Sequence, residues 1–137
     1  MRWMCGILVA SCVSAALMFA GPSPNARAIT GLPPCYHPPR LCVTSFQIPG
    51  DRRHWHLYLA GPKDRYFRRY RLCVMPPDGS LSCDVFRVPP PQHGYFSSMV
   101  TWNRHFPNHG PGQYSARWRR LPDHHLIGQR SFTVSRR

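Results

Sequence analysis

Residues 67–88 read FRRYRLCVMPPDGSLSCDVFRV, which is two alternating runs of residues on either side of a turn. In both runs apolar and polar residues alternate with the period of two that is typical of β-strands. The Pro77-Asp78-Gly79 segment between them has the composition of a three-residue hairpin loop in which the glycine takes the left-handed position. A loop of that length places Cys73 directly opposite Cys83. The stretch therefore predicts a β-hairpin that a disulfide can bridge.

The other cysteines fit a disulfide framework. Downstream of the N-terminal apolar segment the chain has four cysteines, Cys35, Cys42, Cys73 and Cys83, an even number in a short chain. The hairpin register favours Cys73 with Cys83 and leaves Cys35 with Cys42, over the other two connectivities that four cysteines allow. Zinc coordination is the alternative, which the spacings favour less because they lack two short Cys-x2-Cys pairs.

Residues 1–28 have the pattern of a signal peptide. Arg2 precedes an uncharged apolar run from Trp3 to Ala20, and Ala26-Arg27-Ala28 has the small-x-small form of a signal-peptidase site. We expect cleavage after Ala28 and a secreted or extracytoplasmic protein. An uncleaved anchor is the alternative, although the run is shorter than the ~20 apolar residues of a spanning helix.

The remaining chain divides into an arm and one domain. Residues 29–40 contain two Pro-Pro pairs, and because proline lacks the N–H that a strand donates, they predict a Pro-rich extended arm. Residues 41–137 are enough chain for one core. The whole sequence has 18 Lys and Arg, of which Lys63 is the only lysine, and 5 Asp with no Glu, for a net charge of +13. Such a charge predicts either an anionic partner or a self-repelling surface.

Short alternating runs recur between Pro- and Gly-rich turns, and no run keeps a helical period, so the fold is predicted to be all-β. The first run changes its apolar phase between Val43 and Phe46, which predicts a bulge near Thr44-Ser45. In the second run Trp55, Leu57 and Leu59 are predicted to point one way, with Trp55 in the core, while His54, His56 and Tyr58 point the other way and the two histidines face solvent. The seven predicted strands are Leu41–Ile48, His54–Ala60, Phe67–Met75, Leu81–Val88, Tyr95–Trp102, Gln113–Arg120 and Gln129–Ser135.

Residues 112–118, GQYSARW, followed by Ser131-Phe132-Thr133-Val134, resemble the last two strands of immunoglobulin-like and fibronectin III-like sandwiches. The resemblance implies a seven-stranded immunoglobulin-like antiparallel β-sandwich in which Tyr114 opens the sixth strand at a corner. Ala116 stands where antibody-type domains have their second inter-sheet cysteine, so that bridge is not expected. The same stretch is similar to the C-terminal part of periplasmic copper-resistance sandwich proteins. Those proteins bind copper through a histidine at the mature N-terminus, where this chain has Ile29.

That topology implies that the third, fourth, sixth and seventh strands share a sheet, with the third beside the sixth. The strand alternation then turns five arginines to its outer surface, namely Arg69, Arg71, Arg87, Arg117 and Arg119. Guanidinium groups bind phosphate and sulfate in a bidentate manner, so these residues are predicted to bind a polyanion. We expect an anionic envelope polymer, lipid head groups or an envelope protein as the partner. No aromatic residues interleave the arginines, so no specific nucleic-acid readout is expected.

The 8 histidines suggest an alternative function. Loops at one end of the predicted sandwich would hold His93, His124 and His125, with Asp123 as a fourth donor or a supporting partner, and would suit copper or zinc. The spacing is not specific for a metal, because adjacent histidines rarely both reach one ion.

Catalytic signals are few. The sequence has no Gly-x-Ser-x-Gly elbow, no Gly-rich phosphate loop and no acid pair at a useful spacing. We therefore expect a non-enzymatic binding or structural module with no small-molecule substrate. The alternatives are a copper- or zinc-binding protein and, third, a small hydrolase.

Overall fold

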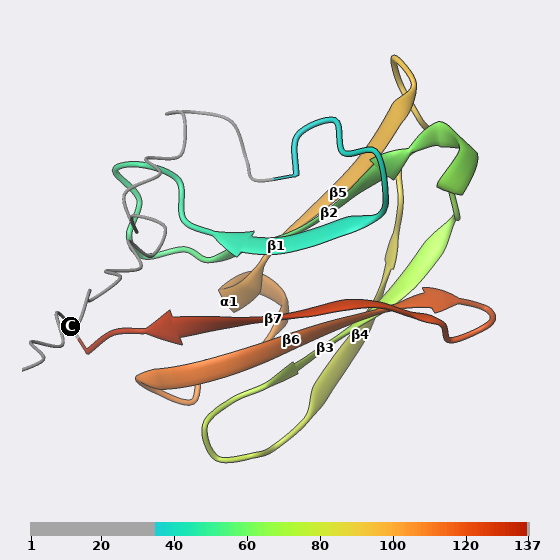
Figure 1. The fold of residues 1–137 in the computed structure, drawn as a ribbon. Helices are drawn as coiled ribbons and strands as arrows, with labels where there is room; N and C mark the ends of the chain where they lie inside the picture. The colour runs from blue at the N-terminus through green and yellow to red at the C-terminus, as the bar shows by residue number, and fades with distance from the viewer. Residues whose placement is uncertain (1–34, 137) are drawn as a thin grey trace, which may run out of the picture.

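The computed structural model describes residues 35–136, and these residues form two antiparallel β-sheets that pack face to face (Figure 1). The three-stranded sheet has the order β1-β2-β5 and the four-stranded sheet the order β4-β3-β6-β7. For the described residues this confirms an all-β fold of seven strands, with the third strand beside the sixth. The strands are β1 (Cys42–Phe46), β2 (His56–Pro62), β3 (Arg69–Met75), β4 (Ser82–Arg87), β5 (Tyr95–Thr101), β6 (Gly112–Leu121) and β7 (Leu126–Val134). The predicted signal peptide and residues 29–34 of the arm lie outside the described residues.

Two short helical turns interrupt the strands, η1 (Lys63–Arg65) and α1 (Trp102–His105). The fifth predicted strand included Trp102, but that residue begins α1, where its carbonyl accepts the backbone N–H of Phe106 at 2.9 Å. No helix among the described residues has the length and apolar character needed to cross a membrane.

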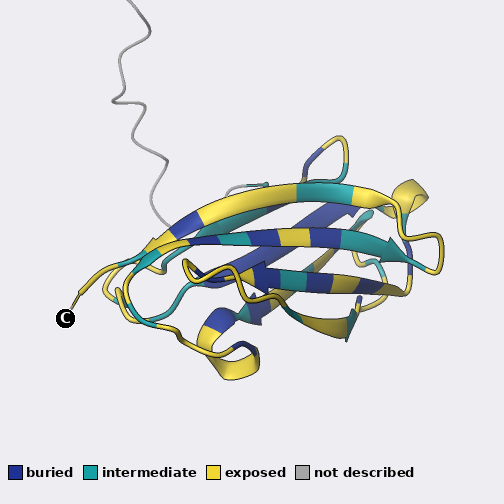
Figure 2. Cartoon of the chain, turned by 90° about the horizontal axis from the view of Figure 1, so that it is seen from below, coloured by how far each residue is buried: buried dark blue, intermediate teal, exposed yellow. Residues whose placement is uncertain are grey.

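The core lies between the sheets and follows the alternation of the strands (Figure 2). On β3, Tyr70, Leu72 and Val74 are at most 1% exposed, while their neighbours along the strand face outward. From the same sheet, Trp118 of β6 and Phe132 of β7 also belong to the core, and Leu57 and Leu59 of β2 belong to it from the facing sheet. Burial of these apolar side chains is the main term that favours the folded state.

The hairpin prediction is confirmed in detail. Cys73 pairs with Cys83 in the β3–β4 register, and Gly79 has a φ of 81°. The N–H of Gly79 donates to the carbonyl of Pro76 at 3.0 Å, which closes the turn. Both predicted disulfides form, Cys73 with Cys83 and Cys35 with Cys42.

Two predictions about the three-stranded sheet were wrong, although Leu57 and Leu59 share the core side of β2 as predicted. The pairing of β1 with β2 runs without a shift from Cys42 to Phe46, so β1 has no bulge near Thr44-Ser45. Phe46 instead lies on the outer face of this sheet, with its ring centroid 5.6 Å from that of His56. His56 is only 7% exposed and so does not face solvent as predicted, and Tyr58 beside it is 9% exposed. Burial lowers the pKa of His56.

Several strand ends also differ from the prediction. β2 begins at His56 because the preceding segment forms a loop in which Asp51 accepts hydrogen bonds from the His54 ring and the Arg53 N–H. β7 begins at Leu126, three residues earlier than predicted, because a register shift between Trp118 and Arg119 extends the β6–β7 pairing.

The Cys73–Cys83 bridge is expected to stabilise the fold through the loop that it closes. Replacing both cysteines by alanine should cost roughly 2 to 3 kcal/mol of unfolding free energy, the loop-closure entropy of a short loop. Urea denaturation of the variant and the wild type measures the difference. Equal unfolding midpoints would show that the bridge does not constrain the unfolded chain.

Gly128 on β7 is expected to set how closely the two sheets approach. A Cβ atom built there would lie 2.5 Å from Cγ2 of Val43 on β1, in the facing sheet. The Gly128→Ala variant should therefore lose about 1 to 3 kcal/mol of stability through overpacking. Adding Val43→Ala should recover part of this loss in a double-mutant cycle, whereas strictly additive effects would contradict the contact.

Candidate functional site

The outer surface of the four-stranded sheet carries the predicted arginines. β3 alternates strictly, so burial of Tyr70, Leu72 and Val74 turns Arg69 and Arg71 outward. Strands β4 and β6 pair with β3 on either side and turn their own arginines to the same surface, because residues directly opposite each other in a sheet share a face. We call the outward set the basic face, and it consists of Arg69, Arg71, Arg87, Arg117 and Arg119.

The register arranges the basic face in rows that run across the strands. One row reads Arg87, Arg69, Leu121 from β4 to β6, and the next reads Val85, Arg71, Arg119, Leu126 from β4 to β7. A third row holds the Cys73–Cys83 disulfide, Arg117 and Gln129. Arginine thus lies directly opposite arginine in two adjacent rows, an arrangement that destabilises a sheet unless the charge is compensated.

Neutral groups hold two of these arginines in place. Nε of Arg117 donates to Oε1 of Gln129 at 3.2 Å, and a terminal nitrogen of Arg119 donates to the carbonyl of His124 at 3.0 Å. Within residues 35–136, the guanidinium groups of Arg69, Arg71 and Arg87 make no side-chain hydrogen bond or ion pair. The basic face therefore keeps its charge and its free N–H donors.

The aspartates of the chain have other partners. Asp123 receives hydrogen bonds from Arg120, which hold its pKa at about 2. The other four aspartates contact groups other than the arginines of the basic face: Asp51 the His54 ring, Asp64 Arg65, Asp78 Ser80 and His109, and Asp84 the N–H of Val85. No carboxylate in the described chain forms an ion pair with an arginine of the basic face.

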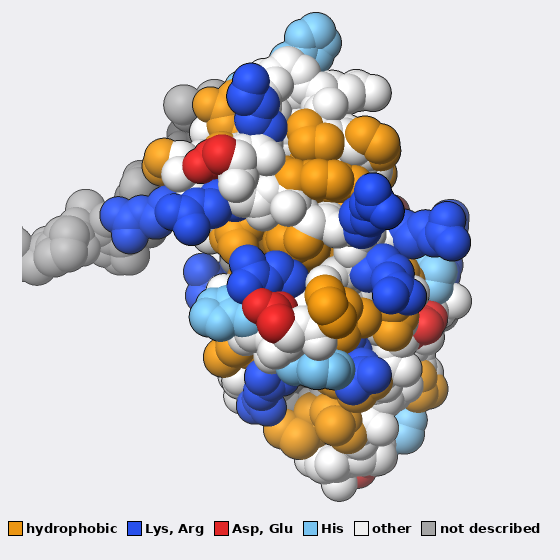
Figure 3. Space-filling model, turned by 90° about the vertical axis from the view of Figure 1, so that its right-hand side faces the viewer, with side chains coloured by type: hydrophobic (Ala, Val, Ile, Leu, Met, Phe, Trp, Pro, Cys, Tyr) orange, Lys and Arg blue, Asp and Glu red, His pale blue; other side chains and the backbone are white. Residues whose placement is uncertain are grey.

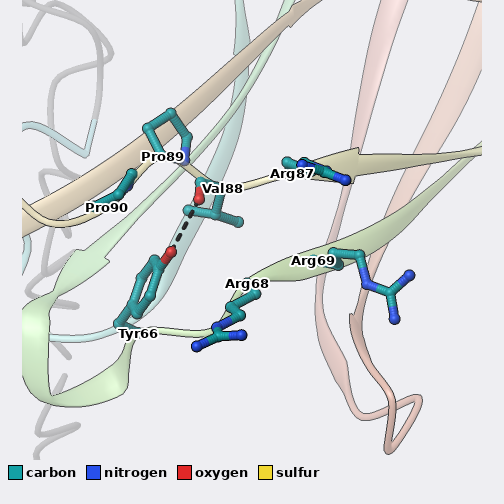
Figure 4. A pocket seen from close by; sticks show the side chains of 7 residues that line it. All are labelled: Tyr66, Arg68, Arg69, Arg87, Val88, Pro89 and Pro90. Atoms are coloured by element: carbon teal, nitrogen blue, oxygen red, sulfur yellow. Dashed lines mark hydrogen bonds between the residues drawn. The ribbon is translucent and has the colours of Figure 1, made fainter.

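A pocket of about 660 Å³ lies at one end of the basic face, where β3 begins and β4 ends (Figure 4). Its apolar lining comes from Tyr66, Val88 and the Pro89-Pro90 segment, and its charges come from Arg68, Arg69 and Arg87. Neither Arg68 nor the pocket was predicted from the sequence. The sequence shows that Arg68 and Arg69 are adjacent, but the pocket also depends on the path of the loop after β4, and no motif in the sequence predicts that path.

The structure does not gather the predicted metal ligands. His93 lies in the turn before β5, whereas His124, His125 and Asp123 lie between β6 and β7. Across the described residues, no group of three or more His, Cys, Asp or Glu side chains could hold a metal ion. The Asp123 carboxylate is occupied by Arg120 instead.

A contact that the sequence did not predict joins two loops at the far end of the β3–β4 hairpin. Nδ1 of His109 lies 2.5 Å from Oδ2 of Asp78 in the turn, and the Ser80 hydroxyl and N–H also donate to this carboxylate. These hydrogen bonds, those from Ser80 first, lower the pKa of Asp78 to about 2. The turn is thereby tied to the loop before β6.

This contact predicts an acid-dependent loss of stability. Because the pKa of Asp78 is about 2 in the folded chain and 3.8 ordinarily, its contribution is complete above about pH 5 and is lost progressively as the pH falls through 2. The Asp78→Asn variant should therefore show a shallower decline of Tm between pH 4 and 2 than the wild type. Thermal denaturation at several pH values measures this, with Asp64→Asn as a control expected to follow the wild type. Parallel declines for Asp78→Asn and the wild type would contradict the assignment.

In comparisons with known proteins, no protein-family model, no curated protein and no solved structure matches this chain. The function of the basic face and its pocket therefore has to be inferred from the residues that form them.

Proposed function

We propose that this chain is a secreted, non-enzymatic binding module that holds an anionic cell-envelope polymer, or another anionic partner, on its basic face. Two intrachain disulfides are typical of proteins that fold in an oxidising, extracytoplasmic environment. The pattern of residues 1–28 supports export.

We also propose that the sandwich is of the immunoglobulin-like type. The division of the strands and the position of β3 beside β6 are consistent with it. Tyr114 supports it further, because its hydroxyl donates to the carbonyl of Gly110 at 2.8 Å and accepts the N–H of His109 at 2.9 Å. A tyrosine bonded to the backbone a few residues upstream is the corner feature of that fold.

The observation that carries the proposed function is the direct opposition of uncompensated arginines. Arg69 faces Arg87 and Arg71 faces Arg119, and none of them has a carboxylate partner in the described chain. An anion placed between two such arginines removes their repulsion and accepts charge-assisted hydrogen bonds from both. Binding of an anion therefore relieves a cost of folding.

The surroundings of the arginines favour recognition of charge over recognition of bases. The outward positions in these rows are aliphatic, polar or part of the disulfide, with no aromatic side chain among them. Single-stranded nucleic acids are bound mainly by stacking on aromatic rings, which the basic face does not offer.

The proposed function predicts that the basic face, and not net charge alone, determines retention on a polyanion. A variant with Arg69, Arg71, Arg117 and Arg119 all changed to Gln should elute from a sulfated-polymer column at much lower salt than the wild type. Its affinity should also depend less steeply on salt, because fewer counterions are released on binding.

The matched control changes four exposed arginines elsewhere to Gln, namely Arg40, Arg52, Arg53 and Arg104. It removes the same charge and should lose much less retention. Equal losses in the two variants would mean that only net charge matters, and the proposed site would be wrong. Thermal denaturation of both variants verifies that they are folded.

A further inference from the structure

The pocket at the end of the basic face is held in shape by the backbone around it. The N–H of Val88 donates to the carbonyl of Arg68 at 2.9 Å, which joins the two strands at this point. The Tyr66 hydroxyl donates to the carbonyl of Val88 at 3.1 Å and so fixes the ring as one wall (Figure 4). Pro89 and Pro90 restrict the loop that forms the opposite wall. A ligand would enter a site that needs little ordering.

The charges of the pocket suit a phosphate group. Arg68, Arg69 and Arg87 line the pocket, and no described carboxylate pairs with any of them. The Arg68 guanidinium points toward the Tyr66 side of the pocket, and those of Arg69 and Arg87 point the other way, along the basic face (Figure 4). Their forked donors match the oxygen atoms of a phosphate. The apolar walls suit the part of the ligand next to that phosphate, which indicates an amphiphilic anion rather than a free ion.

Exposed aliphatic side chains extend the same chemistry over the basic face. In the row Val85, Arg71, Arg119, Leu126, the two arginines are flanked by aliphatic residues that are 43% and 44% exposed. Met75, on the same face of β3, is 42% exposed. The end of the molecule where β3 begins likewise mixes Lys and Arg with hydrophobic side chains (Figure 3). A hydrated polysaccharide offers little apolar surface to such residues, whereas a lipid bilayer offers phosphates and acyl chains together.

We propose that the basic face docks onto the surface of an anionic phospholipid bilayer, with the pocket taking the phosphate of one lipid. This inference rests on the proposed function and names the partner. The arginines contact lipid phosphates, and Val85 and Leu126 enter the boundary between head groups and acyl chains. The pocket adds a position for a single lipid to a surface that otherwise attracts the bilayer by charge.

Vesicle co-sedimentation near physiological salt tests the docking. The purified protein should bind vesicles of phosphatidylcholine that contain phosphatidylglycerol at roughly a third of the lipid, and should bind pure phosphatidylcholine vesicles poorly. The Val85→Ser/Leu126→Ser variant keeps every charge, so it should lose about fivefold or more in vesicle affinity while its retention on the sulfated-polymer column stays unchanged. Its control is Ile48→Ser/Met99→Ser, which replaces two other exposed apolar residues outside the four-stranded sheet and should bind like the wild type.

The pocket is tested by two variants that each remove one charge. Arg68→Gln should weaken vesicle binding by about fivefold, and Arg104→Gln on α1 by much less. Equal affinities for these two variants would overturn the assignment of the pocket. Equal affinities for the two serine variants, or no binding of the wild type to anionic vesicles, would overturn docking on a bilayer. Selective retention on the polymer column would leave the proposed function standing in either case, so the two failures are distinguishable.

Discussion

Strand β3 is the element on which the rest of the structure depends, because it pairs on both sides and alternates without a break. Its inward residues, Tyr70, Leu72 and Val74, are almost completely buried. A shift of one residue would bury Arg69 and Arg71 and expose the apolar set, a change that the core could not tolerate. The same constraint holds Arg87 and Arg119 in place, since β4 and β6 take their register from β3. The alternation of inward and outward residues along β3 therefore determines both the core and the basic face.

The sequence predicted best where two independent signals agreed. In the β3–β4 hairpin, the turn residues and the cysteines required the same register, and strand period then determined which arginines face outward. Strand β2 was harder because it is buried on both faces, with Leu57 and Leu59 on one and His56 and Tyr58 on the other. Period alone assigns one face to solvent, and nothing in the local sequence shows that an outer face is covered.

The features that sequence reasoning missed depend on loops that meet only after folding. Asp78 and His109 are 31 residues apart, and each looks like an ordinary loop residue until the turn and the β5–β6 connection come together. The pocket with Arg68 also depends on the path of the chain after β4. The loops that hold His93, His124 and His125 show the opposite case. Placing these loops at one end of a sandwich does not bring their side chains together, because each turn directs its side chains independently. Loop conformation, rather than strand order, limits how much of a site can be predicted.

Among the described residues β4 is an edge strand, which has a consequence for how copies of this chain behave at high concentration. An edge strand exposes unpaired backbone groups that can add a strand from another molecule, a common route to aggregation. A second copy that approached this edge would bring its own arginines toward Arg87 on β4 and Arg71 on the neighbouring strand, and the like charges would oppose the pairing. A multivalent anion would remove that repulsion at the same time as it recruited many copies. The same charge that opposes pairing between free copies would then allow them to lie side by side on an anionic surface.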